Sequence, residues 1–301
     1  MNEKLALLNR ELARRSLGEW SKFTNPAYII APFHRKLLAA LERVESGDCK
    51  RLIVSMPPRM GKTEAVSVNL PAWFLGRNPD KRVIVASYGA SLAYINSRKS
   101  RNLLTAFGSE VFGVTVAKDS AAVDEWSIEG HRGGLAAVGV DGPATGKGAD
   151  LAVIDDPIKD MKEALSEVVR SNVKEWYKSV LRTRLHPGGS IVVLQTRWHE
   201  DDLTGWLLEE ARNGGEEWET LVLPMVNDAG QLLWPGRYSR AEVEAIKVAV
   251  GSTVWQALYQ QSPSAAEGGM FKRHFWRFWS QPRVQWFAPA RLQPTAQRGT
   301  A

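Results

Sequence analysis

The stretch SMPPRMGKTE, residues 55–64, has the end of a phosphate-binding loop but lacks its beginning. The full pattern is G-x-x-x-x-G-K-[ST]. Gly61, Lys62 and Thr63 supply its last three positions, whereas Met56 stands where the first glycine belongs. The preceding apolar run, RLIVSM, predicts a buried strand, and a helix is expected directly after the loop. A strand, a tight loop and a helix start together place backbone N–H groups and the positive helix end around a phosphate.

This context favours a nucleotide site over a plain strand–turn–helix junction with a surface lysine, which remains the alternative. Lys62 would reach the terminal phosphates, and the Thr63 hydroxyl would hold Mg²⁺. The loop residues expected to bind the nucleotide are Pro58, Arg59, Met60, Gly61, Lys62, Thr63 and Glu64.

Two adjacent acids end a second apolar run, DLAVIDDP, residues 150–157. We expect Asp155 to bind the metal, directly or through water, and Asp156 to be the general base that activates the attacking water. Two like charges at the end of a buried strand repel each other unless a cation lies nearby. The alternative is an ordinary helix start, because acids favour helix N-termini and Pro157 suits the first helical position.

A third motif, VVLQTRWHEDDL, covers residues 192–203. Its strand is expected between the loop strand and the acidic strand, so that Gln195 and Thr196 would contact the terminal phosphate or its water. Such a position can couple hydrolysis to movement. The run HEDD suggests a metal site, but four consecutive residues at a helix start cannot all face one ion. Helix capping by Glu200, Asp201 and Asp202 is therefore favoured.

Strand and helix patterns alternate along the chain. Apolar runs predict strands at 51–56, 82–87, 134–140, 151–155, 190–196 and 218–223. Helical patterns occur at 3–17, 33–47, 63–76, 91–107, 162–181 and 201–212. Pro71 is expected to kink or shorten the helix that follows the loop.

Strands that are apolar on both faces predict an α/β fold, with a mostly parallel sheet flanked by helices. The predicted parts are an N-terminal helical segment over 1–50, a core over 51–262, and a linker with a partly disordered tail over 263–301.

Composition places the chain among ordinary soluble proteins. Of 301 residues, 44% are hydrophobic and 24% are charged, and there is no apolar run of about 18 residues that could span a membrane. The start lacks a signal-peptide pattern, and the single cysteine, Cys49, excludes an internal disulfide and a Cys-based zinc site. A reducing cytoplasm is the expected location. The net charge of +6 permits a polyanionic partner without requiring one.

Three segments together closely resemble the ATPase half of the large terminase subunit of tailed bacteriophages and prophages. They are PFHRKLLAALERVESGDCKRLIVSMPPRMGKTE, ATGKGADLAVIDDPIKD and VVLQTRWHEDDLTGWLL. The likeness covers about residues 30–262 and continues into WQALYQQSPSAAEGGMFKRHFW. In that family the loop characteristically lacks its first glycine and carries an arginine before the last one, as Arg59 does here. The loop therefore looks like a family variant.

The resemblance implies a P-loop (RecA/ASCE-like) motor that uses ATP and Mg²⁺ to push double-stranded DNA into a capsid. It implies a ring of copies on a portal protein, a small terminase subunit as partner, and the cytoplasm of a bacterial host. Phe33 and His34 would help hold the adenine, although a core or capping role for His34 is an equal alternative. The resemblance also implies that Lys147 touches phosphate or DNA, and that Arg59, acting within its own subunit or on a neighbouring one, stabilises the phosphoryl transition state; an arginine from elsewhere is the alternative.

The sequence departs from the family pattern after residue 262. A full-length large terminase continues into an RNase H-like nuclease, but no aspartate or glutamate follows Glu267 here. Two-metal cleavage needs several carboxylates, so no nuclease activity is expected. A truncated, frameshifted or split gene would each explain this pattern. The alternative functions are a helicase-like or remodeller-like ATPase and a non-hydrolysing remnant that only binds DNA or portal.

Overall fold

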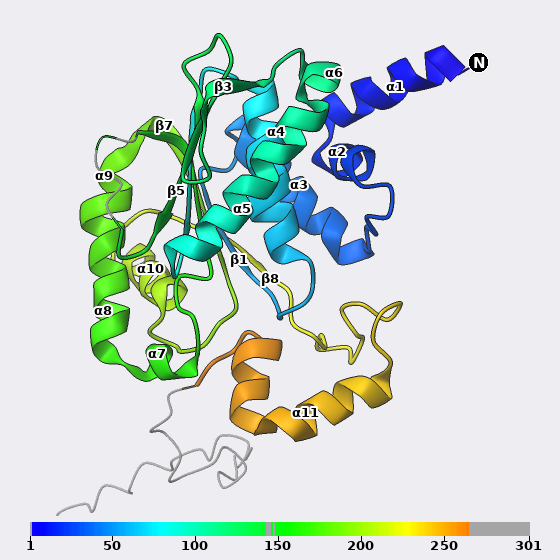
Figure 1. The fold of residues 1–301 in the computed structure, drawn as a ribbon. Coiled ribbons are helices and arrows are strands. Elements are labelled where there is room, and N and C mark those ends of the chain that lie inside the picture. The colour runs from blue at the N-terminus through cyan, green and yellow to red at the C-terminus, as the bar shows by residue number, and fades with distance from the viewer. Residues whose placement is uncertain (1, 143–145, 147, 265–301) are drawn as a thin grey trace, which may run out of the picture. The chain divides into compact units, whose positions relative to one another are not determined.

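The structure, a computed structural model, describes residues 2–142, 146 and 148–264. These residues form an eight-stranded sheet with the strand order β3-β4-β5-β2-β6-β7-β1-β8 (Figure 1). The strands are β1 (Arg51–Ser55), β2 (Arg82–Ser87), β3 (Val116–Ala121), β4 (Glu125–Ile128), β5 (Gly134–Gly139), β6 (Ala149–Asp155), β7 (Leu185–Gln195) and β8 (Glu219–Val222). In this order, every neighbouring pair from β5 onwards is parallel. The β3–β4 and β4–β5 pairs are antiparallel. The predicted α/β fold with a mostly parallel sheet is confirmed.

Helices cover both faces of the sheet. The α-helices are α1 (Asn2–Arg15), α2 (Leu17–Thr24), α3 (Pro32–Ser46), α4 (Leu70–Arg77), α5 (Ala90–Leu103), α6 (Ser109–Phe112), α7 (Met161–Leu165), α8 (Glu167–Trp176), α9 (Arg182–Arg184), α10 (Leu203–Arg212) and α11 (Arg240–Val254). Short π-helical turns are η1 (Glu64–Asn69), η2 (Leu104–Gly108), η3 (Tyr177–Leu181) and η4 (Trp255–Tyr259).

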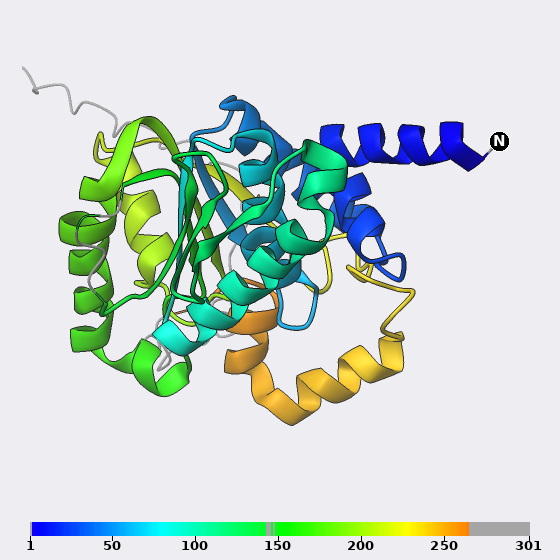
Figure 2. The same cartoon turned by 45° about the horizontal axis from the view of Figure 1, so that its top comes forward.

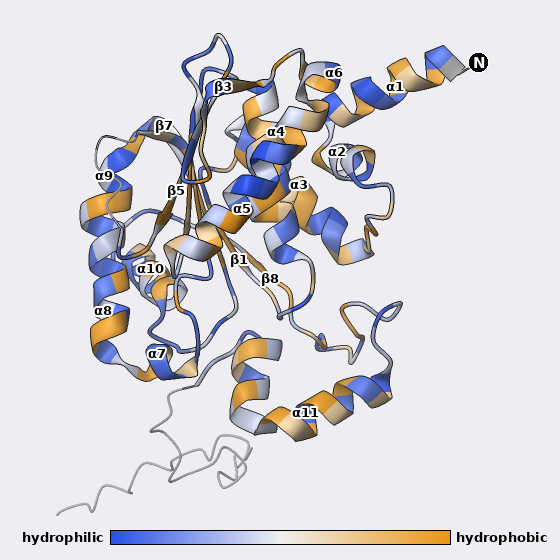
Figure 3. Cartoon of the chain, in the orientation of Figure 1, coloured by the Kyte–Doolittle hydropathy of each residue, from blue (hydrophilic) through white to orange (hydrophobic). Residues whose placement is uncertain are grey.

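Two hydrophobic cores lie on the two faces of the sheet, because the side chains of each strand alternate between them. Along β7, Val192 and Leu194 belong to the core that α2 to α5 cover, and Ile191 and Val193 belong to the core under α8 and α10. Figure 2 shows the same two layers from a second direction, and Figure 3 shows apolar strands between them. This alternation also fixes which residues at the strand ends can meet.

The N-terminal helices share the first of these cores. Leu17, Trp20 and Leu37 are fully buried in it, and the indole N–H of Trp73 donates to the carbonyl of Ala13 at 3.1 Å. The predicted boundary at residue 50 stays a prediction, but helices α1 to α3 and the sheet bury one continuous apolar surface.

Several elements differ from the sequence expectation. Strands β3 and β4 were not predicted, because each is short and half-exposed and lacks an apolar run. Strand β8 was expected to be a core strand, but it lies at the edge, and 50% of the Val222 side chain is exposed. The helix predicted over 162–181 is broken at Ser166, which ends α7 and caps α8 through a bond from the Val169 N–H.

Pro71 does not shorten its helix, although the sequence predicts a kink or a shortening. The proline lacks an N–H and its ring disfavours the α-helical turn before it. The chain meets this constraint with the π-helical turn η1, and α4 then continues through Pro71 to Arg77. The helix is neither ended nor shortened at this point.

The described residues include no helix that is both long and apolar enough to cross a bilayer. The expectations for Lys147 and for the tail after residue 264 fall on residues outside the described part of the chain.

Candidate nucleotide-binding site

The loop between β1 and η1 has the geometry that its sequence predicts. Helix geometry begins at Lys62, directly after Gly61, and two loop residues have left-handed backbone: Arg59 with φ 65° and Gly61 with φ 78°. A Cβ on Gly61 would lie 3.2 Å from Nε2 of His34, so a side chain at this position would be both strained and crowded. The glycine therefore lets the loop turn sharply against α3.

His34 joins the loop to helix α3. Its Nδ1 accepts the N–H of Ala31 at 3.0 Å, and its Nε2–H donates to the carbonyl of Met60 at 2.9 Å. Both bonds require the neutral imidazole, and burial lowers the pKa of His34. Phe33 beside it is buried, and both rings pack against Trp234. His34 has no ring nitrogen left for a ligand.

Lys62 meets two of the predicted catalytic residues. Its Nζ lies 2.9 Å from a carboxylate oxygen of Asp156 and also donates to the Thr196 hydroxyl. The Thr196 N–H donates to the same carboxylate at 2.8 Å. Asp156 reaches these partners because its backbone has φ 46°, a left-handed conformation that aspartate tolerates better than most residues. The loop, the acidic strand and β7 thus converge at one point.

Asp155 is buried at the end of β6 and accepts hydrogen bonds from three helical side chains. Ser67 donates at 2.7 Å and Asn96 at 3.3 Å, both to Oδ2, and the Thr63 hydroxyl lies 3.5 Å from Oδ1. Burial, and then the neighbouring charge of Asp156, raise the pKa of Asp155 above its usual range. A buried carboxylate of this kind gains most from a nearby cation.

The donor set of Thr63 and Asp155 fits Mg²⁺. Both offer hard oxygen atoms, which Mg²⁺ prefers, and Mg²⁺ usually takes only one or two carboxylates and leaves its other positions to water and phosphate. Oδ2 of Asp155 is already engaged by Ser67 and Asn96, so Oδ1 is the oxygen that faces Thr63. When bound, the ion would neutralise charge that builds up on the phosphate oxygens.

The strand order brings these residues together. Strand β7 lies between β6 and β1, as predicted, and its last residues stand beside the loop strand with Ser55 opposite Gln195. Side chains alternate along β7, so Thr196 faces Lys62 whereas the Gln195 side chain bonds to Asp202 on the other side of the sheet. The structure brings Thr196 to the loop and does not bring the Gln195 side chain there.

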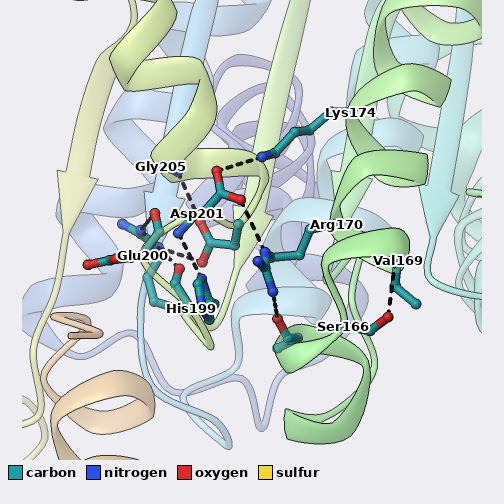
Figure 4. Close-up of polar contacts among 11 residues, drawn as sticks. Ser166, Val169, Arg170, Lys174, His199, Glu200, Asp201 and Gly205 are labelled. Atoms are coloured by element: carbon teal, nitrogen blue, oxygen red, sulfur yellow. Dashed lines mark hydrogen bonds and ion pairs between the residues drawn. The ribbon is translucent and has the colours of Figure 1, made fainter. Parts of the chain in front are cut away.

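The HEDD run links two helices behind the site (Figure 4). Asp202 caps α10 by accepting the Gly205 N–H at 2.9 Å, and Asp201 instead pairs with Lys174 at 2.5 Å and Arg170 at 3.1 Å. The described residues contain no cluster of three or more His, Cys, Asp or Glu that could hold a metal ion. The acids of this run thus divide between capping and helix-to-helix ion pairs.

The remaining predicted loop residues lie around this centre. Arg59 is exposed and makes no hydrogen bond or ion pair with any described residue. Glu64 faces Lys99 at 3.7 Å, and Pro58 and Met60 form the turn itself.

Sequence reasoning missed Ser67 and Asn96. A signal existed for Ser67, because it lies four residues after Thr63 and so on the same helical face. Asn96 comes from a different helix, and only the fold brings it to Asp155.

An apolar groove lies between the start of α3 and residues 231–240. It has a volume of about 770 Å³ and is bordered by Ile29, Pro32, Trp234 and Tyr238, among others. Trp234 joins the groove to the loop, because its ring centre is 5.0 Å from that of His34, which bonds to Met60.

The sheet order and the converging loop define a protein of the P-loop NTPase class. The chain belongs to the family described as terminase large subunit, T4likevirus-type, N-terminal, whose profile matches residues 53–268. The comparison with curated proteins found no match.

Among the solved structures that are similar to the chain are two phage large terminases. A mutant ATPase domain of the large terminase from Thermus phage P74-26 has a TM-score of 0.53 at 14% identity, over 81% of this chain and 97% of that domain. A large terminase from a thermophilic bacteriophage, in complex with ATP-gamma-S, has a TM-score of 0.42 at 12% identity, over 79% of this chain. The chain spans only 50% of the length of that second protein.

Proposed function

We propose that this chain contains the ATP-hydrolysing motor domain of a phage DNA-packaging terminase. One observation carries the proposal: the Lys62 ammonium, the Asp155–Asp156 pair and the Thr63 and Thr196 hydroxyls converge where parallel strands end. A positive group, a site for a divalent cation and a carboxylate that can accept a proton are what phosphoryl transfer to water needs. Membership in the terminase family supports DNA as the substrate of the motor.

The contacts of Lys62 suggest how ATP binding would activate the general base. A terminal phosphate of ATP would compete with Asp156 for the ammonium group, because both are anions within reach of Nζ. Asp156 released from Lys62 would be free to accept a proton from the attacking water. Thr196 would then bond to the phosphate or to this water. Lys62 would thus both bind ATP and control whether Asp156 can act as the general base.

Arg59 is the proposed source of an additional positive charge. It is exposed at the tip of the loop, without an ionic partner among the described residues, so its guanidinium is free to contact a phosphate in its own subunit or a neighbouring one. An arginine in that role stabilises charge that develops in the transition state.

For the adenine we propose the groove at Trp234, which packs against His34, instead of direct contact with Phe33 and His34. Both of these side chains are buried, and the two ring nitrogens of His34 already have partners. Trp234 and Tyr238 present aromatic surface to the groove, and aromatic faces stack well on bases. Phe33 and His34 would then support Trp234 from behind.

The partners follow from the family and are proposed with it. They are double-stranded DNA, a portal protein, a small terminase subunit, and further copies of this chain in a ring within the bacterial cytoplasm. For residues 1–301 themselves we propose no nuclease activity, because two-metal cleavage needs several carboxylates and residues 268–301 contain no carboxylate side chain.

The test compares ATP hydrolysis by the wild type and Lys62→Ala, each with and without double-stranded DNA and Mg²⁺. The wild type should hydrolyse ATP slowly alone and faster with DNA, and Lys62→Ala should lose roughly 100-fold or more. Lys118→Ala is the matched control, because that lysine is exposed on the edge strand β3. Equal rates in the wild type and Lys62→Ala would contradict the proposal.

A plasmid-cleavage assay with Mg²⁺ or Mn²⁺ tests the nuclease half of the proposal. The plasmid should remain intact, and robust cutting by the purified chain would refute the absence of nuclease activity.

A further inference from the structure

Two consecutive glutamines clasp the C-terminal helical segment onto the strand ends beside the phosphate loop. Gln260 binds Val226 twice: its Oε1 accepts the Val226 N–H at 3.1 Å, and its Nε2 donates to the Val226 carbonyl at 2.9 Å. Gln261 is buried, and its Oε1 accepts the Arg197 N–H at 3.2 Å. Its Nε2 donates to the carbonyl of Leu258, so both ends of each amide are hydrogen-bonded.

The two anchor points straddle the strand that carries the loop. Val226 follows β8 and Arg197 follows β7, and these are the two neighbours of β1 in the sheet. The N–H of Met225 also donates to the Tyr259 carbonyl at 2.7 Å, which strengthens the β8 side. The Gln261 bond is the contact on the β7 side that involves a residue adjacent to Thr196.

Gln261 holds this position with a left-handed backbone at the end of the helical turn η4. Its φ is 56°, in the left-handed region that only glycine, asparagine and aspartate enter readily. Gln261 directly follows the C-cap residue of η4, where a left-handed residue commonly ends a helix, and the Ser262 N–H closes the turn by donating to the Gln256 carbonyl at 2.9 Å. The turn and the bond to Arg197 together fix the direction of the Gln261 side chain.

Thr196 connects the Gln261–Arg197 contact to Lys62. Its hydroxyl accepts from Lys62 and its N–H donates to Asp156, so a phosphate that takes over Lys62 changes both partners of Thr196. Arg197 is the next residue, and its guanidinium is fixed to the buried carboxylate of Asp202 at 2.7 Å. A shift at Thr196 would therefore be felt at the Arg197 N–H, where Gln261 is bound.

We propose that Gln261 is a positioning residue that transmits occupancy of the phosphate loop through Arg197 to residues 255–264. Gln260 keeps the other side of the segment fixed to Val226, so the change becomes a tilt or loosening of the segment about that anchor. The inference rests on the proposed function, because it requires a nucleotide at Lys62. It adds that residues 255–264 are the segment that responds when a nucleotide binds at that site.

Hydrogen exchange with and without ATP-gamma-S and Mg²⁺ tests the relay. In the wild type, ATP-gamma-S should change the exchange of peptides covering 192–200 and 255–264 by roughly three- to tenfold, the range expected when one hydrogen bond is made or lost. Gln261→Ala should bind ATP-gamma-S within about twofold of the wild type, yet its 255–264 peptide should no longer respond. Gln256→Ala, at an exposed position one turn earlier, should respond like the wild type.

Gln261→Gly separates the side-chain hydrogen bond from the left-handed backbone. Glycine adopts the positive φ readily, so this variant should fold at least as well as Gln261→Ala and still lose the response. A full response in both Gln261 variants would overturn the relay. Binding of ATP-gamma-S to the wild type without any change in 255–264 would overturn it too, while the proposed function would stand. Failure of ATP-gamma-S to bind the wild type at all would overturn the proposed function and the relay together.

Discussion

At the residue scale, the hydrogen bonds of Asp155 would prepare its carboxylate for the proposed metal ion. A buried carboxylate is costly unless hydrogen bonds or a cation stabilise its charged form. Ser67 and Asn96 donate to one oxygen and leave the other directed towards Thr63. The two donors therefore fix the orientation of the ligand as well as its charge, as partners behind a metal ligand commonly do.

Ser67→Ala should weaken the response to Mg²⁺. Without the Ser67 hydroxyl, the charged form of Asp155 loses its shortest hydrogen bond, and the apparent Mg²⁺ affinity should fall about 10-fold. A Mg²⁺ titration of ATP hydrolysis and of nucleotide binding measures the effect. Ser91→Ala, at an exposed position of α5, is the control. An unchanged Mg²⁺ requirement would show that Ser67 is not needed to position Asp155.

Arg59→Gly should separate folding from catalysis. Arginine with φ 65° is strained, so glycine should raise the free energy of unfolding by about 1 kcal/mol. The same change removes the guanidinium, so ATP hydrolysis should drop at least roughly 100-fold. Thermal unfolding and a hydrolysis assay on the same preparation test both effects. Unchanged hydrolysis would exclude Arg59 as a catalytic residue.

Some residues of the site could be predicted from sequence and others could not. Lys62, Thr63, Asp155, Asp156 and Thr196 stand at strand ends or in a recognisable loop, and parallel strands bring such positions to one edge. Contacts that depend on the direction of a side chain were harder to predict from the sequence. Gln195 and Thr196 differ by one residue, and the alternation along β7 sends them to opposite faces of the sheet.

At the element scale, ion pairs at the amino ends of the strands hold the sheet to its helices. Glu216 accepts from Arg51 at the start of β1, at 2.7 Å, and from Arg182 in α9, at 2.8 Å. Hydrogen bonds from Arg51, and then from Arg182, lower the pKa of Glu216 to about 2. Elements that are far apart in sequence are thus joined at the edge opposite the nucleotide site.

Glu216→Gln should make the protein less stable at neutral pH but not in acid. Because the folded pKa lies below the ordinary value of 4.5, the ionised group stabilises the fold above that pH. The contribution is lost as the pH falls towards the folded pKa. The group is partly exposed, so the expected decrease in Tm at pH 7 is only about 1–4 °C.

Thermal unfolding of Glu216→Gln at several pH values measures the loss. The neighbouring exposed acid, changed in Glu217→Gln, is the control and should leave the curve unchanged. A Tm difference that stays constant from pH 7 down to about 2 would argue against the ion pairs as its cause.

The strongly apolar strands were predictable as elements, and the irregular ones were not. Runs such as RLIVSM and RVIVAS are buried on both faces, whereas β3 is paired on one side only and carries Lys118 and Asp119 in its middle. The break at Ser166 depends on a single capping bond inside a pattern that is otherwise helical. Such local bonds leave no periodic signal.

At the scale of the whole molecule, the two cores lie on opposite faces of one sheet. Trp20 of α2 is fully buried and packs against the ring of Phe112, with ring centres 5.1 Å apart. The N-terminal helices therefore contribute to the same apolar core as strands that follow much later in the chain. Their unfolding should be coupled to that of the sheet.

Trp20→Ala should destabilise the whole described region and not only its N-terminal helices. The lost packing and the cavity should lower the free energy of unfolding by about 3–5 kcal/mol. Circular dichroism and tryptophan fluorescence should report one transition that shifts as a unit. Leu7→Ala, at an exposed position of α1, should have little effect. A separate early transition confined to α1 to α3 would support an independent N-terminal segment.

The pairing of Lys62 with Asp156 and Thr196 also bears on the end of each catalytic cycle. When the products leave, the Lys62 ammonium would again bond to the Asp156 carboxylate and the Thr196 hydroxyl. Tight retention of inorganic phosphate is then unnecessary, and product inhibition should be weak. An ATPase with many consecutive turnovers gains speed from an active site that releases its products readily.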